Sequence, residues 1–382
     1  MFWFGWILFS GIAVWGVPPV LWFVCRRLQP VLTNHTPSGE WPAVSVIVPA
    51  RNEAAAIERA LRSLLKSDYP GIQLLAVNDR STDDTGAIMN RVASDDSRCQ
   101  VIDVEVLPDG WLGKNHAMHL AAGIAKGEYL LFTDGDVIHE PAALRSAVTY
   151  LKRKRLSHLC LLPRMIPGGF FENCIVAFFG LAFAIGQQVH LIRTRWPFAY
   201  VGVGAFNLID AEFYRSFGGH TAIAMDVIDD AKLGKLVKQH GGTQDFIGAP
   251  GLLSIRWYDS LWEVITGLEK NGFAALNYSL TSVMLCTVVF FATMMLPYIP
   301  PLLLPLSETG GFLATVLLWH VMYGVAAVSF GGSVFLVPFF PVAASLMSFA
   351  FWRSAWVTLR QDGVRWRNSF YSLDELRKGL YR

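Results

Sequence analysis

The chain has few cysteines and few charges for its length of 382 residues. Its five cysteines show no paired spacing, which argues against a zinc site or a disulfide framework and is typical of a reducing compartment. Charged residues make up only 16%, the net charge is +2, and no basic block favours nucleic acid as a partner. The G-x-G-x-x-G and G-x-x-x-x-G-K-[ST] motifs are both absent, which disfavours a dinucleotide-binding Rossmann domain and a P-loop enzyme.

Apolar residues are abundant instead, at 53%, and they gather at the two ends of the chain. The first 25 residues carry no charge and are followed by two arginines. This pattern predicts a transmembrane anchor at 1–27, because about 20 apolar residues cross a bilayer. Arginines directly after a span favour the cytoplasmic side for the next part of the chain. A polar linker is expected at 28–42.

The C-terminal apolar region predicts transmembrane helices at 273–352, with spans near 275–297, 311–330 and 333–352. The tail, 353–382, carries seven basic and three acidic residues, which favours a cytoplasmic tail. A cytoplasmic domain and a cytoplasmic tail require an even number of crossings between them. Three spans conflict with this requirement, so we expect one of them to be re-entrant or interfacial.

The middle of the chain alternates short apolar runs with helical patterns, which predicts an α/β domain with a mainly parallel sheet. Strands are expected at 44–50, 72–77, 100–105, 129–132, 158–163, 200–209 and 243–248, and the first helix at 52–67. Residues 168–192 are apolar and long enough to span a membrane. We expect them to lie on the membrane surface or to line an acceptor groove, because a crossing would separate the acidic clusters on either side.

Acidic residues come directly after several of the expected strands. Asp79 ends the second strand, and Asp134 and Asp136, separated by glycine, come after the fourth. Ligands of open α/β sheets gather at the carboxyl ends of strands, and paired carboxylates suit a hard divalent cation. A simple Asp-Gly turn is the alternative for this pair. Asp229 and Asp230 fall at an expected helix start, where the helix dipole alone would favour carboxylates.

The order of these motifs resembles a family 2 glycosyltransferase with the GT-A fold. The resemblance covers about residues 43–270 and includes Val46–Glu53, Asn78–Asp83 and the segment Gly113–Asn115. The loop 108–114, the tail segment Trp366–Tyr371 and the apolar ends narrow it to the membrane-bound branch that glycosylates lipids. Within that branch the chain is similar to the hopanoid-biosynthesis-associated glycosyltransferases, with ceramide glucosyltransferases and carotenoid glycosyltransferases as relatives.

The resemblance implies a site for a nucleotide-sugar donor, most often a UDP-sugar. The turn from Pro49 to Glu53, which includes Arg51, and Asp79 would hold the base and ribose. Lys114, at the start of an expected helix, is a candidate phosphate contact.

The remaining acidic residues would carry the chemistry. Asp134 would lie near the ribose or sugar and, with Asp136, bind Mg²⁺ or Mn²⁺ on the diphosphate. Asp230 would be the general base, with Asp229 in a position usually held by Glu. A single displacement would invert the anomeric carbon.

The resemblance places Arg256 and Trp257 against the diphosphate and the acceptor. Leu253 departs from the family's pattern, because a Gln usually stands three residues before this Arg-Trp pair, and this argues against a processive polymer synthase. The expected enzyme is a multi-pass protein of the bacterial inner membrane, with a cytoplasmic catalytic domain and a lipid acceptor. Two alternatives stay open, a polyprenyl-phosphate glycosyltransferase and a non-catalytic membrane scaffold.

Overall fold

The computed structural model describes residues 1–28, 41–258 and 260–381, so most of the linker expected at 28–42 lies outside the described residues. The chain forms two compact units. The helical unit comprises residues 1–28, 166–190 and 257–364. The sheet unit comprises 29–165, 191–256 and 365–382. This division differs from the expected boundaries, because the contiguous domain 43–270 is interrupted by 166–190 and most of the tail belongs to the sheet unit.

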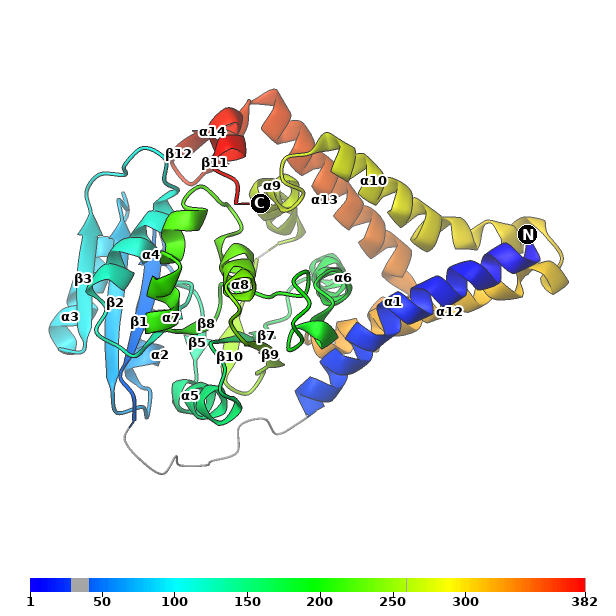
Figure 1. Ribbon diagram of the computed structural model, residues 1–382. Helices are drawn as coiled ribbons and strands as arrows, with labels where there is room; N and C mark the ends of the chain where they lie inside the picture. Colours follow the sequence, from blue (N-terminus) through cyan, green and yellow to red (C-terminus); the bar gives the residue numbers. More distant parts are fainter. Residues whose placement is uncertain (29–40, 259, 382) are drawn as a thin grey trace. The chain divides into compact units, whose positions relative to one another are not determined.

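A seven-stranded mixed sheet forms the centre of the sheet unit, in the order β3-β2-β1-β4-β8-β6-β9 (Figure 1). Its strands are β1 (Val44–Ala50), β2 (Ile72–Asp79), β3 (Cys99–Val104), β4 (Tyr129–Phe132), β6 (His158–Leu162), β8 (Asn207–Asp210) and β9 (Gln244–Gly248). Strands β1 to β4 are parallel, and only β8 runs antiparallel to its neighbours β4 and β6. The prediction of a mainly parallel sheet is therefore confirmed.

Helices cover both faces of this sheet, and the sequence of β1 shows why. Val44, Val46 and Val48 alternate with Ile47, so the strand presents apolar side chains to two separate clusters. The first cluster joins the sheet to α2 (Ile57–Leu65), α3 (Thr85–Asp95) and α5 (Ala143–Lys154). The second joins it to α4 (Gly113–Ile124), α7 (Ala211–Ser216) and α8 (Asp229–Gln239).

Two expected elements are wrong in part. The strand expected at 200–209 exists only as β8, because Gly202 and Gly204 take an irregular path against the start of α8. The helix expected at 52–67 begins at Ile57. The residues before it form a turn, in which Asn52 has a φ of 56°.

Smaller sheets complete the unit. Strands β5 (Ile138–His139), β10 (Leu253–Ile255) and β7 (Arg164–Met165) form one of them. Strands β11 (Gly363–Trp366) and β12 (Ser369–Ser372) form a hairpin that precedes α14 (Leu373–Lys378). The sequence indicates only a basic tail in this last region.

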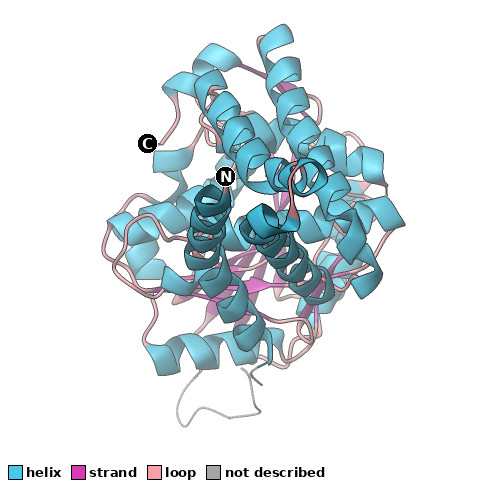
Figure 2. Ribbon diagram, turned by 90° about the vertical axis from the view of Figure 1, so that its right-hand side faces the viewer, coloured by secondary structure: helices cyan, strands magenta, loops and turns pink. Residues whose placement is uncertain are grey.

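Apart from its last two residues, the described part of the helical unit is helix and connecting turns (Figure 2). Its helices are α1 (Phe2–Leu28), α6 (Phe170–Gly186), α9 (Leu261–Ala275), α10 (Leu280–Phe290), α11 (Pro300–Leu303), α12 (Leu306–Ser329) and α13 (Phe340–Arg360). Helices α1 and α12 pack side by side (Figure 1). A Cβ added at Gly311 would lie 2.4 Å from the backbone of Gly5, so glycine allows these two backbones to approach closely.

Four helical segments of this unit are long and apolar enough to cross a membrane: Trp3–Trp22, Leu280–Leu303, Leu306–Ser329 and Val334–Arg360. Helix α6 is shorter, with 17 residues, which at 1.5 Å per residue is less than the roughly 30 Å of a hydrocarbon core. Its side chains Cys174, Ile175 and Phe178 are buried in the apolar cluster that also includes α12 and α13.

Three histidines are buried in the sheet unit. His139 bonds Thr133 across 3.1 Å, and His158 lies 3.1 Å from the side-chain oxygen of Asn207. Burial lowers the pKa of His139 and His220 to about 3 and that of His158 to about 4. Below the ordinary pKa of 6.5 the unfolded chain therefore binds protons that the folded protein does not, so these histidines destabilise the fold as pH falls.

We expect His139→Gln to reduce the loss of stability between pH 8 and pH 5 by about 2 kcal/mol, the linkage cost of one such histidine at pH 5. The measurement is thermal unfolding in detergent at both pH values, read as the difference between variant and wild type. Carboxyl groups with raised pKa values act in the opposite direction, and this comparison cancels them. His240→Asn, at an exposed position, should keep the wild-type pH dependence. An identical pH dependence for His139→Gln would contradict the assignment.

Candidate active site

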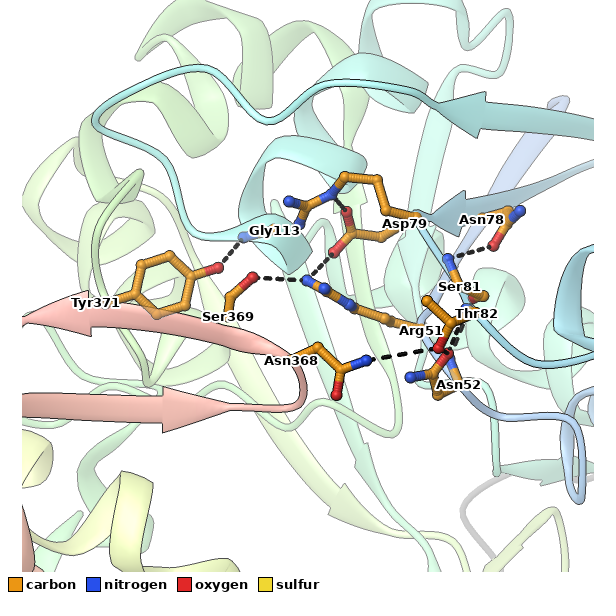
Figure 3. A network of polar contacts seen from close by, with 11 residues as sticks. Arg51, Asn52, Asn78, Asp79, Ser81, Thr82, Gly113, Asn368, Ser369 and Tyr371 are labelled. Carbon is orange, nitrogen blue, oxygen red and sulfur yellow. Dashed lines mark hydrogen bonds and ion pairs between the residues drawn. The ribbon is translucent and has the colours of Figure 1, made fainter.

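The loops after β1 and β2 are tied to each other at the carboxyl edge of the sheet (Figure 3). The backbone N–H of Asn52 donates to Ser81 Oγ across 3.1 Å, and that of Thr82 donates to Asn52 Oδ1 across 2.8 Å. The N–H of Glu53 donates to Thr85 Oγ1 across 2.8 Å. The two strand-end loops predicted to hold a nucleotide therefore form one bonded surface.

Asp79 lies at the end of β2 and is buried. Its Oδ1 accepts from Arg80 Nε across 2.8 Å, and its Oδ2 lies 4.0 Å from Arg51 Nη1. A Cβ added at Gly113 would lie 2.2 Å from Asp79 Oδ2, so only glycine fits at the first residue of α4. The structure thus joins Arg51 and Asp79, which the sequence assigns to one nucleotide site.

A pocket opens beside these loops and gathers five of the expected site residues. It is lined by Pro49, Lys114, Met118, Phe132, Thr133, Asp134, Gly204, Asn207, His220, Asp229, Asp230 and Leu233. The lining comes from the ends of β1 and β4, the loop before β8 and the starts of α4 and α8. Carboxylates 95 residues apart in the sequence therefore meet in one pocket, as the order of strands predicts.

Lys114 lies between the acidic groups of the pocket. Its Nζ is 2.9 Å from Asp134 Oδ1 and 3.3 Å from Asp229 Oδ2. Burial acts to lower the pKa of Lys114, but the carboxylates of Asp134, Asp229 and Asp230 outweigh burial and raise it, so the ammonium stays charged. Burial raises the pKa of Asp229 to about 7, while Lys114 acts in the opposite direction.

Asp230 is held by backbone rather than by a side-chain cation. Its Oδ2 accepts from the N–H of Gly204 across 2.8 Å, and its Oδ1 accepts from the N–H of Ala231 across 2.7 Å. Burial raises the pKa of this carboxyl group, although Lys114 and the two N–H groups act against the rise. A fixed carboxylate that is more basic than usual can accept a proton from a hydroxyl group.

The glycines before β8 allow the backbone to reach these carboxylates. A Cβ added at Gly202 would lie 1.6 Å from the carbonyl oxygen of Asp230, and one at Gly204 would lie 2.4 Å from Asp134 Oδ2. We expect Gly204→Ala to reduce activity at least about 10-fold by displacing Asp134 from its place in the pocket. The assay is sugar transfer by purified protein, with thermal unfolding to confirm that the fold is kept. Gly123→Ala, where nothing lies within 4 Å of the added Cβ, is the matched control and should be fully active.

Asp136 has the environment expected of a cation ligand. Its Oδ1 is buried without a hydrogen-bond partner among the described residues. Burial, followed by the charges of Asp134 and Glu53, raises its pKa to about 7. In the described part of the chain no three or more His, Cys, Asp or Glu side chains form a metal-binding group. Asp134 and Asp136 therefore fit a hard divalent cation only if other ligands, such as phosphate oxygens of a donor, complete its coordination.

The division between the two units falls within the expected Arg256–Trp257 pair. Arg256 is exposed at the end of the sheet unit, after β10. Trp257 belongs to the helical unit, where its ring centroid lies 4.6 Å from that of Phe179. Leu253, at the position where Gln is usual, is buried in the core cluster and pairs with His139 across the small sheet. An apolar side chain thus fits this position as part of the core.

Sequence reasoning missed several residues around the pocket. His220 lines it, although the sequence around this residue is that of an ordinary turn between helices. Arg367, Asn368, Ser369 and Tyr371 all contact residues 51–113, although the sequence places them in a cytoplasmic tail. The segment Trp366–Tyr371 was the one available signal, because it belongs to the family resemblance although its composition indicates no structural role.

Comparisons with known proteins agree with this geometry. Residues 45–215 match the family described as glycosyl transferase family 2. The 4,4'-diaponeurosporenoate glycosyltransferase of Staphylococcus aureus strain N315 is 28% identical over 212 residues, which are 55% of this chain and 54% of that protein. The protein of the same name from strain MRSA252 is 28% identical over 195 residues, half of each chain. The chain thus spans about half the length of the curated relatives that it matches.

A solved structure is similar over nearly the whole chain. It is the mannosyltransferase PcManGT from Pyrobaculum calidifontis in complex with GDP-Man and Mn²⁺, which covers 94% of this chain and 99% of its own at a TM-score of 0.53. Its sequence identity of 18% means that this likeness shows the fold. The chain therefore carries a glycosyltransferase family 2 domain with the GT-A fold, flanked by apolar helices that could span a membrane.

Proposed function

We propose that the protein is a membrane-attached inverting glycosyltransferase that moves a sugar from a nucleotide-sugar donor to a hydroxyl group of a lipid. The observation that carries this proposal is the pocket at the carboxyl ends of β1 and β4. There a fixed carboxylate, Asp230, lies close to the Lys114–Asp134 ion pair and to Asp229. The pocket thus combines a proton acceptor with charged groups suited to a diphosphate.

Each of these groups has a part in the chemistry. Asp230 accepts the proton of the acceptor hydroxyl as its oxygen bonds to the anomeric carbon. The bond between that carbon and the donor diphosphate breaks on the opposite face, so the configuration inverts. Lys114 is the cation that the protein itself offers to the leaving diphosphate. A divalent cation held by Asp134 and Asp136 would neutralise further charge on that leaving group.

The other site residues hold the donor in this proposal. Pro49, Arg51, Glu53 and Asp79 contact the base and ribose, because they form the bonded surface of the β1 and β2 loops. Asp229 keeps Lys114 in place through their ion pair.

A lipid acceptor agrees with the apolar helices, since such an acceptor does not arrive through water. The name of the Staphylococcus aureus relatives, diaponeurosporenoate glycosyltransferase, supports an apolar acceptor, and a hopanoid is the acceptor that we propose. Arg256 and Trp257 would contact the diphosphate and this acceptor. The proposed location is the bacterial inner membrane, with the sheet unit in the cytoplasm. Because residues 365–382 belong to the sheet unit, residues 257–364 cross the membrane an even number of times.

The test is transfer by the purified wild-type protein in detergent with Mn²⁺ or Mg²⁺. A panel of radiolabelled UDP- and GDP-sugars is offered with a hopanoid alcohol, a carotenoid, ceramide or a polyprenyl phosphate. Metal-dependent label in the lipid fraction identifies donor and acceptor, and NMR of the product should show the inverted anomer. Retained configuration would contradict the single displacement.

The alternatives give different results in the same assay. Label that appears only on polyprenyl phosphate would identify a polyprenyl-phosphate glycosyltransferase, whose acceptor needs no general base. No label, together with no binding of any nucleoside diphosphate by calorimetry, would support a non-catalytic scaffold and overturn the proposal.

A further inference from the structure

The C-terminal hairpin packs on the same loops that form the proposed donor surface (Figure 3). Arg51 Nη1 donates to Ser369 Oγ across 2.9 Å. The guanidinium of Arg367 forms an ion pair with Glu53. The backbone N–H of Gly113, which has no partner inside α4, donates to Tyr371 Oη across 3.1 Å, and this bond is buried. One short hairpin therefore contacts the loops after β1 and before α4, more than 250 residues earlier in the chain.

The end of the tail makes a second set of contacts, with the segment that carries the catalytic carboxylates. The backbone N–H of Tyr381 donates to Asp226 Oδ2 across 3.0 Å, and the carbonyl oxygen of Tyr381 accepts from Lys232. Asp226 and Lys232 are both buried, and Asp226 lies three residues before Asp229. Residues 365–381 thus connect the donor loops to the start of α8.

Arg367 has a backbone conformation that arginine rarely adopts. It comes directly after β11 and has a φ of 52°, in the left-handed region that glycine and asparagine prefer in hairpin turns. Its side chain is 43% exposed, and its partner Glu53 is among the charges that act on Asp136. The turn therefore holds a guanidinium at the edge of the acidic cluster, at a cost in backbone energy.

We propose that the turn of this hairpin is part of the donor site and that Arg367 binds an anionic group of the nucleotide sugar, leaving Glu53 as the nucleotide enters. A planar guanidinium binds a phosphate through paired hydrogen bonds, which are stronger than a half-exposed pairing with one carboxylate. Ser369 and Tyr371 position the turn through their bonds to Arg51 and Gly113. This inference rests on the proposed function, because it requires a nucleotide donor at these loops.

The experiment measures binding of UDP, GDP, CDP and dTDP with Mn²⁺ by calorimetry to the full-length protein in detergent. We expect Arg367→Gly to weaken the preferred nucleotide about 10- to 100-fold, as for loss of a charged hydrogen-bonding pair, and Arg367→Lys to weaken it less. Glycine suits the positive φ, so Arg367→Gly should unfold at the wild-type temperature or above. Weaker binding then reports the lost side chain rather than a lost hairpin.

The control is Lys378→Ala in α14, which removes a cation of the same tail whose side chain is 75% exposed and pairs with Asp374. It should bind as the wild type does. Hydrogen exchange gives an independent readout, in which the preferred nucleotide should slow exchange in Ser369–Ser372 of the wild type. Wild-type affinity in Arg367→Gly, with no change in hairpin exchange, would overturn this inference and leave the proposed function standing. Failure of the wild type to bind any of the four nucleotides would overturn both.

Discussion

Asp230→Asn is expected to lower kcat for transfer to a hydroxyl acceptor by about 10²- to 10⁴-fold, the range for loss of a general base. Asparagine preserves the shape and can still accept the N–H groups of Gly204 and Ala231 through its carbonyl oxygen. It cannot take up a proton. Binding of the nucleoside diphosphate, measured by calorimetry, should therefore stay near the wild-type value while turnover is lost.

The pH dependence of kcat provides a second check on Asp230. Burial raises the pKa of its carboxyl group above the usual value near 4, so the wild-type rate should rise with pH through that higher pKa, as the base becomes ionised. The residual rate of Asp230→Asn should lack this dependence. Asp95→Asn, which changes an exposed carboxylate paired with Arg62, is the matched control and should keep both rate and pH profile.

A comparison with Asp229→Asn separates the two neighbouring carboxylates. Asp229 pairs with Lys114, so its loss should weaken donor binding as well as turnover. Full activity of Asp230→Asn towards a hydroxyl acceptor would show that the base is another group. Activity kept only towards a polyprenyl phosphate would instead identify the acceptor, because an ionised phosphate needs no base.

The sequence predicted the part of the site that parallel strands determine. Strands β1, β2 and β4 were recognisable as buried apolar runs, and their carboxyl ends must lie at one edge of a parallel sheet. That geometry alone brings Asp79 and Asp134 to the same edge. The motif order then indicated that Asp229 and Asp230 join them, and the pocket lining agrees for three of these four residues, Asp134, Asp229 and Asp230.

The remaining features depend on contacts that local patterns do not encode. The path of residues 200–206 is set by the approach of Gly202 to the carbonyl of Asp230, so an apolar, glycine-containing run that resembles a strand becomes irregular. The contact of Ser369 with Arg51 spans 318 positions. Nothing in the alternation of residues 363–372 indicates such a partner, and the basic composition of the region favoured a solvated tail.

Asp136→Asn is expected to lower transfer by about 100-fold or more, because the loss of a cation ligand removes several kcal/mol of charge stabilisation. The same change should make the metal-free protein more stable at pH 8. The folded-state pKa of Asp136 is raised from 3.8 to about 7, so the folded protein holds this proton more tightly than the unfolded chain does. The free energy of unfolding therefore falls as pH rises from about 4 towards 7, and above pH 7 the full cost of a buried charge remains. Asparagine removes that cost.

Thermal unfolding of Asp136→Asn with and without Mn²⁺ gives a readout independent of activity. In the wild type Mn²⁺ with a nucleoside diphosphate should raise the unfolding temperature, since a ligand that binds only the folded state stabilises it. The variant should start higher than the wild type at pH 8, lose most of that advantage at pH 5 and respond little to Mn²⁺. Asp109→Asn, at an exposed loop position, should behave as the wild type in every condition. An unchanged response to Mn²⁺ in Asp136→Asn would place the cation elsewhere, because the unpartnered Oδ1 of Asp136 is the feature on which this assignment rests.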